Sequence, residues 1–136
     1  MSKRRIIPLA VLCIPAILIF LSCMDFIPPE DMTSTAIGET FFRIHLYAKS
    51  KGVLVELLSD LPERSGYGNR LTDGWGRALL FELNEDGILT LQSLGEDGLA
   101  GGVGSNRDIV CRYRTRDDTG RFIVSDDLWI VTGEVK

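Results

Sequence analysis

A β-hairpin is predicted by the stretch Ala78-Leu-Leu-Phe-Glu-Leu-Asn-Glu-Asp-Gly-Ile-Leu-Thr-Leu-Gln-Ser-Leu94. Two short apolar runs, Ala78–Leu83 and Ile88–Leu94, flank the segment Asn84–Gly87. The Asn, Asp and Gly residues of that segment are typical of a tight turn. We therefore expect two antiparallel strands joined at this turn.

The same turn imitates the beginning of an EF-hand calcium loop, because oxygen-bearing side chains alternate before Gly87. However, Ser93 stands where an EF-hand has its bidentate glutamate, and strands rather than helices flank the segment. We interpret it as an ordinary hairpin turn.

Further elements are predicted on both sides of the hairpin. Ile109–Thr115 is expected to form a third strand, and 121–125 with 128–132 a second hairpin. A helix is expected to begin at Ser34 or Thr35, either of which can cap it, and to end near Gly52. Its apolar stripe has helical spacing and comprises Ile37, Phe41, Ile44 and Ala48.

These elements predict an α+β fold in which an N-terminal helix packs on a small antiparallel β-sheet. Between helix and sheet, Val53–Leu61 is expected to make short turns that pack Leu54, Leu57 and Leu58 against the sheet. Trp75, between two glycines, is expected to pack over the helix. His45 is expected on the flank of the helix, and Cys111 as a small core residue.

The N-terminus has the architecture of an export leader. Basic residues precede the apolar run Ile6–Leu21, and the first acid, Asp25, follows it. Because basic residues stay on the cytoplasmic side, the rest of the chain is expected to face the periplasm. We expect residues 1–23 to be this leader, 24–35 a proline-bearing linker, and 36–136 one globular domain.

Two fates of the leader are open. Phe20-Leu21-Ser22-Cys23 resembles a bacterial lipoprotein cleavage box, in which Cys23 would take the lipid, although Phe20 departs from the usual leucine. Alternatively Ile6–Met24, with 19 residues, remains as a membrane-spanning anchor. Both fates predict a membrane-anchored protein of the bacterial cell envelope.

Composition argues against nucleic acid as a partner. The net charge is −4, and aspartates are interleaved with the arginines of residues 107–121, as on a solvated strand face. The three cysteines have no metal-binding or disulfide spacing. With a single histidine, no serine elbow and no spaced acid pair, the sequence gives little support to an enzyme.

The segment Leu94–Asp108 is the candidate functional region, because five of its 15 residues are glycine and several others carry oxygen. Such a loop is costly to order. Carboxylates, hydroxyls and inward-turned carbonyls are the ligands of a hard cation such as calcium, whose binding would offset that cost.

The order of motifs resembles the C-terminal domain of the major pseudopilin of type II secretion systems. The resemblance rests on Thr72-Asp-Gly-Trp-Gly-Arg77, the hairpin, Ser93-Leu-Gly-Glu-Asp-Gly98, Gly101-Gly-Val-Gly104 and Asp108-Ile109. In that family the loop binds calcium, so the resemblance implies calcium here. The carbonyl of Leu94 and the carboxylate of Asp97 would be ligands, with Asp108 at the far end.

Two further calcium donors are plausible on chemical grounds, namely Ser105 and the carbonyl of Leu99. Two residues depart from the family pattern. Arg107 stands beside Asp108 where some members have another acid, which would weaken the site or shift its ligands. Gly74 replaces the family proline and is expected to loosen the turn around Trp75.

The N-terminus departs most from the family, since it lacks the cleavage glycine and the Phe-Thr-Leu-Ile-Glu motif that guides filament assembly. We therefore expect a structural or accessory envelope protein related to type II secretion, with secretion-system or envelope proteins as partners, rather than a standard filament subunit. The alternative is a metal-free extracytoplasmic binding module for a protein or ligand, without a secretion role.

Overall fold

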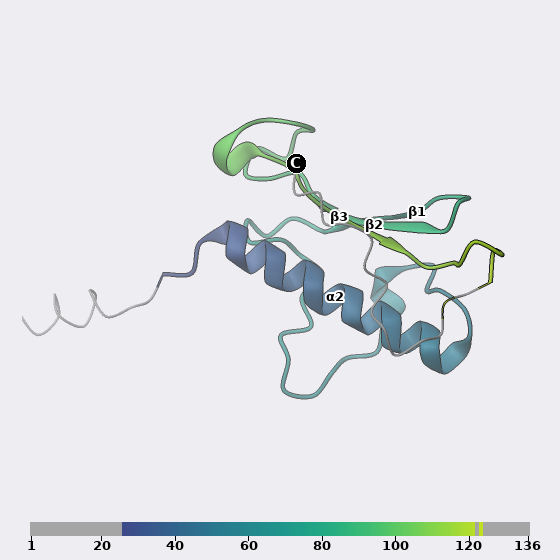
Figure 1. Ribbon diagram of the computed structural model, residues 1–136. Coiled ribbons are helices and arrows are strands. Elements are labelled where there is room, and N and C mark those ends of the chain that lie inside the picture. The colour runs from purple at the N-terminus through teal and green to yellow at the C-terminus, as the bar shows by residue number, and fades with distance from the viewer. Residues whose placement is uncertain (1–25, 122, 124–136) are drawn as a thin grey trace, which may run out of the picture.

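A computed structural model describes residues 26–121 and residue 123. A long helix, α2, packs against one face of a three-stranded antiparallel sheet in the order β1-β2-β3 (Figure 1). The predicted α+β class is therefore confirmed. The elements are α2 (Pro29–Lys51), the short 3-10 helices η1 (Leu58–Asp60) and η2 (Gly104–Asn106), and the strands β1 (Leu80–Leu83), β2 (Ile88–Ser93) and β3 (Ile109–Arg114).

The predicted leader, with Cys23, lies outside the described residues. So does the predicted closing hairpin, apart from Arg121 and Ile123. Among residues 26–121 and 123, no helix has both the length and the apolar character needed to cross a membrane.

The hairpin predicted from residues 78–94 is confirmed. Strand β1 pairs with β2 so that Leu80 lies opposite Gln92 and Leu83 lies opposite Leu89. The side chain of Asn84 closes the turn by accepting a hydrogen bond from the backbone N–H of Ile88 at 2.7 Å. The predicted third strand, β3, pairs with the other edge of β2.

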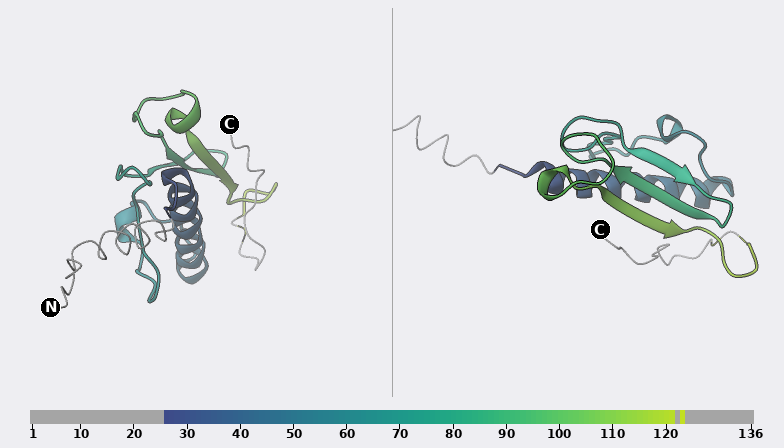
Figure 2. Two further views of the ribbon diagram at one scale, coloured as in Figure 1. Left: turned by 90° about the vertical axis from the view of Figure 1, so that its left-hand side faces the viewer. Right: turned by 90° about the horizontal axis from the view of Figure 1, so that it is seen from above.

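The core lies between α2 and the sheet, which form two layers (Figure 2). Ile37 and Ile44 on α2 and Leu89 and Leu91 on β2 are almost completely buried. Burial of each such side chain contributes about 1.5–3 kcal/mol to folding. Phe41 stacks on Tyr113 of β3 with ring centroids 3.7 Å apart, which fixes the helix over the sheet.

The helix begins earlier than predicted, at Pro29 rather than at Ser34 or Thr35. The predicted linker 24–35 is therefore wrong from residue 29 onward. Proline at the first helical position has a suitable φ and no N–H to satisfy, and two acids in the first turn favour the helix dipole. Instead of capping the helix, the hydroxyls of Ser34 and Thr35 donate to carbonyls one turn back.

The extra helical turns are held by a close backbone contact with Gly74. A Cβ at Gly74 would lie 2.0 Å from the carbonyl oxygen of Pro29. The N–H of Gly74 also donates to the hydroxyl of Thr33 at 2.8 Å, while Thr33 donates to Pro29. Gly74 therefore admits the start of α2, while the predicted loosening of the Trp75 turn stays a prediction.

Residues 53–61 only partly follow the prediction. Leu54 and Leu58 pack against the core, whereas Leu57 has 61% of its surface exposed, so its predicted contact with the sheet is wrong. Val55 and Leu61 are the fully buried residues of this segment.

The loop from Leu61 to Arg70 is fastened to α2 by Arg43, of which only 3% is exposed. Its guanidinium donates to the carbonyls of Leu61, Pro62 and Asn69 at 2.9, 3.1 and 3.3 Å. Three carbonyl acceptors offset the cost of burying this charged group. The Asn69 side chain in turn bonds both backbone groups of Arg64, which keeps the loop compact.

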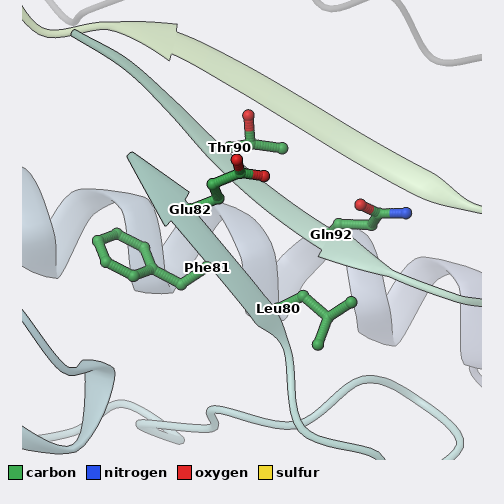
Figure 3. Close-up of a pocket in the computed structure, with 5 residues that line it drawn as sticks. All are labelled: Leu80, Phe81, Glu82, Thr90 and Gln92. Carbon is green, nitrogen blue, oxygen red and sulfur yellow. The ribbon is translucent and has the colours of Figure 1, made fainter. Parts of the chain in front are cut away.

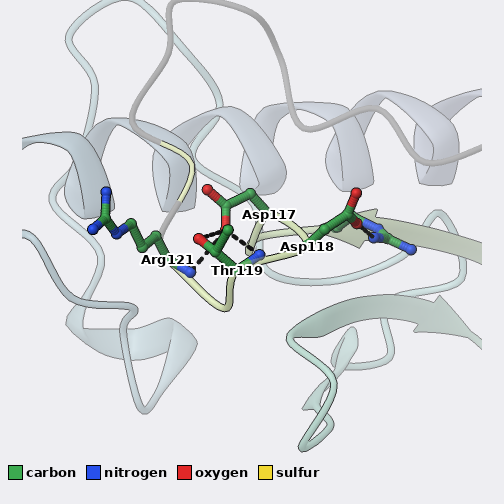
Figure 4. Close-up of polar contacts among 5 residues, drawn as sticks. Asp117, Asp118, Thr119 and Arg121 are labelled. Carbon is green, nitrogen blue, oxygen red and sulfur yellow. Dashed lines mark hydrogen bonds and ion pairs between the residues drawn. The ribbon is translucent and has the colours of Figure 1, made fainter.

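After β3 the chain reverses in a tight turn (Figure 4). The carboxylate of Asp117 accepts hydrogen bonds from the Thr119 hydroxyl and from the backbone N–H of Thr119 and Arg121. These bonds, chiefly the one from the Thr119 hydroxyl, lower the pKa of Asp117. Arg114 and Asp118 form an exposed ion pair at 3.0 Å, consistent with a solvated strand face.

Candidate functional site: the glycine-rich loop

The glycine-rich loop, residues 94–108, connects β2 to β3 and contains η2. In all three views it lies at the end of the molecule where α2 begins (Figures 1 and 2). Its two halves close on each other. The N–H of Glu96 donates to the carbonyl of Ser105 at 2.9 Å, and the hydroxyl of Ser105 donates to the carboxylate of Glu96.

Two glycines permit this closure. Gly95 and Gly102 have φ of +68° and +87°, and a Cβ on either would lie within 2.7 Å of the carbonyl oxygen of Asn106. A side chain at either position would therefore collide with backbone and strain its own backbone. The many glycines, which make the loop costly to order, are thus also what allows it to fold back on itself.

Arg77 holds the first half of the loop from outside. Its guanidinium donates to the carbonyl of Gly95 at 2.8 Å and also to the carbonyl of Glu96. Gly98 leaves room for this side chain, because a Cβ there would be 2.8 Å from the Arg77 Nε. A positive group therefore occupies two carbonyls near the start of the loop.

A buried polar chain joins the base of the loop to the Trp75 turn. Asp73, only 3% exposed, accepts hydrogen bonds from the N–H groups of Trp75 and Arg77 at 3.0 and 2.8 Å. Its other oxygen accepts from the hydroxyl of Ser93 at 2.7 Å, and Ser93 accepts from the N–H of Gly95. The Trp75 turn, β2 and the loop are thus one connected unit.

Sequence reasoning did not identify Asp73, Ser93 or Arg77 as residues that hold the loop, although all three belong to the quoted motifs. The signal was the spacing of Asp73 and Arg77, since an aspartate can accept hydrogen bonds from N–H groups two and four residues on. Trp75 is half-buried and packs against the core, whereas its predicted place over the helix stays a prediction.

The structure places the predicted calcium ligands in three different hydrogen-bonded groups. One oxygen of Asp97 accepts from the N–H of Leu99 at 3.0 Å, and Ser105 pairs with Glu96. Asp108 lies at the β2 side of the loop, where its Oδ2 accepts from the amide of Gln92 at 3.1 Å. Leu94 is half-buried beside Ser93 at the base, and Leu99 is exposed.

The donor chemistry of the loop suits calcium in part. The Oδ1 of Asp108 is buried without a hydrogen-bond partner, and such an atom is costly unless a proton donor or a cation reaches it. Glu96 and Ser105 add a carboxylate next to a hydroxyl. In the described part of the chain, no three His, Cys, Asp or Glu side chains form a group that could hold a metal ion.

Other features of the described residues provide fewer groups that could bind a ligand or react. A surface hollow on the sheet is lined by Leu80, Phe81, Glu82, Thr90 and Gln92, so it contributes a single carboxylate (Figure 3). His45 is buried near Phe41, not on the flank of the helix as expected. Cys111 is half-buried against the core, and burial together with Cys111 raises the pKa of Tyr113.

Comparison with known proteins adds no assignment, since no family model matches the chain and no curated protein matches it.

Proposed function

We propose that this chain is a non-catalytic, membrane-tethered protein of the bacterial cell envelope. Its pseudopilin-like domain faces the periplasm and has a structural or accessory role related to type II secretion. The glycine-rich loop is its functional element, and calcium is the proposed ligand of that loop.

The observation that carries the proposal is the fixed attachment of the loop to the start of the helix. Gly74 contacts Pro29, the adjacent Asp73 binds Ser93, and Ser93 binds Gly95 at the base of the loop. A loop of this composition would otherwise lose much conformational entropy on ordering. Fixation of the loop by several buried contacts is expected if the loop must present a defined surface to a partner.

The secretion role is inferred from the resemblance to the major pseudopilin of type II secretion systems. The motifs that carry it, from Thr72–Arg77 to Asp108-Ile109, come together around this one loop rather than being scattered over the molecule. Their shared location supports the proposal that they form one functional unit.

Calcium, when bound, would supply a charge that neutralises the loop carboxylates. The proposed ligands are the carboxylates of Asp97 and Asp108, the hydroxyl of Ser105 and the carbonyls of Leu94 and Leu99. The unpartnered Oδ1 of Asp108 is the best support for this part of the proposal. Extracytoplasmic calcium sites commonly bind at about 0.1–1 mM, so the loop is expected to respond in the millimolar range.

Thermal unfolding of the full-length chain in a mild detergent tests the metal. Added millimolar calcium should raise the Tm by several degrees relative to chelator, and Asp97→Ala should remove that increase. Asp60→Ala, in an exposed segment away from the loop, is the matched control and should respond like the unmodified chain.

The secretion role is tested in a bacterium that carries the chain. Deletion should reduce the amount of periplasmically folded proteins released to the medium, and the unmodified chain should restore it. The chain itself should fractionate with membranes. Unchanged release would contradict the secretion role whatever the calcium result.

The metal-free binding module remains the second candidate, and the contacts of Arg77 favour it. Two loop carbonyls already accept hydrogen bonds from this guanidinium, which orders the loop without a bound ion. A Tm that does not respond to calcium, with normal protein release in the deletion strain, would support this second function.

A further inference from the structure

The most exposed large apolar side chains of the described residues belong to two segments. Val103, Phe26 and Leu99 have 84%, 82% and 68% of their surface exposed. Phe26 directly precedes α2, while Leu99 and Val103 lie on the outer part of the glycine-rich loop. Large apolar groups held in water at this level indicate a contact surface when they occur together.

These two segments share one end of the molecule. The loop lies beside the first turns of α2 in each view (Figures 1 and 2). Direct contacts support the same placement, because Gly74 touches Pro29 and the neighbouring Asp73 is hydrogen-bonded through Ser93 to Gly95. We call this end, with Phe26, Ile27, Leu99 and Val103, the apolar end.

The length of the preceding chain sets how far the apolar end can be from the membrane. Only five residue steps separate Leu21, the last residue of the apolar leader run, from Phe26. A fully extended chain spans at most about 3.6 Å per residue, so Phe26 lies within about 18 Å of the end of that run. A lipid attached at Cys23 would bring it closer still.

The loop is built to present Leu99 and Val103 rather than to fold them inward. Arg77 and the Glu96–Ser105 pair hold its base, and Gly95 and Gly102 pack directly on the backbone of Asn106. Because these contacts order the loop before it meets a partner, binding costs less conformational entropy.

The charges around the apolar end indicate which lipids it suits. The exposed acids near it are Glu96, Asp97 and Asp31. The exposed bases near it are Arg107, then Arg77, which donates to the carbonyls of Gly95 and Glu96, and Arg70, which lines a hollow together with Ile27. Acids and bases balance, so attraction to anionic headgroups does not drive the contact. The favourable contribution that remains is insertion of the apolar side chains into an uncharged lipid interface.

From these observations we propose that the outer part of the glycine-rich loop, through Leu99 and Val103, rests on the surface of the bilayer to which the chain is tethered. The occupant of the apolar end is therefore lipid. This inference rests on the membrane tether of the proposed function, but it does not depend on calcium or on secretion.

Quenching by brominated lipid tests the contact in the full-length chain. Val103→Trp and Leu57→Trp are each placed in nanodiscs of phosphatidylcholine, with or without bromine on the acyl chains. Leu57 is a matched control, because it is 61% exposed and belongs to the segment that follows the C-terminal end of α2. Subtracting the signal of the unmodified chain isolates the added tryptophan.

We expect bromine to quench the tryptophan at 103 at least twofold more than the tryptophan at 57. Replacing a third of the phosphatidylcholine by phosphatidylglycerol should leave that ratio unchanged within error. Equal quenching at both positions, as for a loop that waits for a protein partner, would overturn the inference.

The tether is assessed separately in the same samples. Co-elution of the unmodified chain with nanodiscs is the expected result, and a chain that elutes free of lipid would overturn both the tether and the loop contact. Co-elution with equal quenching would overturn the loop contact alone. Both positions are exposed, so near-ultraviolet circular dichroism should show native folding of each variant.

Discussion

Replacement of Gly74 by alanine should be strongly destabilising, because the start of α2 leaves no room for a side chain there. The new Cβ would lie 2.0 Å from the oxygen and 2.6 Å from the carbon of the Pro29 carbonyl. Both are backbone atoms of a helix, so relief requires that the first turn move. Overpacking costs about 1–3 kcal/mol, and the movement that relieves it would break the Gly74–Thr33 hydrogen bond at a further cost of about 0.5–1.5 kcal/mol, which together give about 1.5–4.5 kcal/mol.

Thermal unfolding of the full-length chain in detergent, monitored by near-ultraviolet circular dichroism, should therefore show a Tm lower by at least about 6 °C. Gly38→Ala is the matched control, because Gly38 is a solvent-exposed position in the middle of α2 and no atom lies within 4 Å of a new Cβ there. That change should stabilise the chain by about 0.5–1 kcal/mol.

The proline of the family pattern gives a sharper version of the same experiment. Gly74→Pro introduces the same collision and also removes the N–H that donates to Thr33. It should destabilise the chain at least as much as Gly74→Ala. A Tm within about 2 °C of the unmodified chain for either variant would refute the close contact between Gly74 and Pro29.

Three further predictions concern the residues that hold the loops and the core. Arg77→Lys keeps the charge, but a lysine cannot bind the carbonyls of Gly95 and Glu96 in the same way, so the free energy of unfolding should fall by about 1 kcal/mol. Hydrogen exchange should then be faster at the N–H groups of Glu96 and Leu99. Arg43→Lys should cost about 2–4 kcal/mol in urea denaturation, since a lysine ammonium cannot serve all three carbonyls, one of which is fully buried. A change below about 0.5 kcal/mol would contradict the proposed fastening of the 61–70 loop by Arg43. The raised pKa of Tyr113 means that the folded state favours the protonated phenol, so its contribution to stability is present below about pH 10 and is lost as the pH rises further. Tyr113→Phe should therefore shift the midpoint of alkaline unfolding to higher pH, and an unchanged midpoint would exclude Tyr113 as a contributor.

The loop geometry also refines the interpretation of the glycines in the sequence. From composition, the five glycines of Leu94–Asp108 indicated a loop that is costly to order and a candidate cation site. In the fold, Gly95 and Gly102 are positions of backbone contact, and Gly98 accommodates Arg77. A glycine-rich loop can thus be closely packed at some positions, and at these three the glycine is required because neighbouring atoms leave no space for a side chain.

Local sequence patterns were sufficient for the α+β class, the 78–94 hairpin and the third strand. Each of these depends on neighbouring residues, such as the turn residues Asn84 and Gly87 or the alternation along Ile109–Thr115, and so can be recognised within a short window. The candidate loop could be located in the same way from its composition.

Long-range contacts were required for everything that positions that loop. The start of α2 at Pro29 depends on Gly74, the loop base depends on the bond between Asp73 and Ser93, and the 61–70 loop depends on Arg43. These pairs are separated by 18 or more residues, and no periodicity or spacing rule connects them. Their energy comes from excluded volume and from hydrogen bonds in buried surroundings, which exist only after the helix and the sheet have packed together.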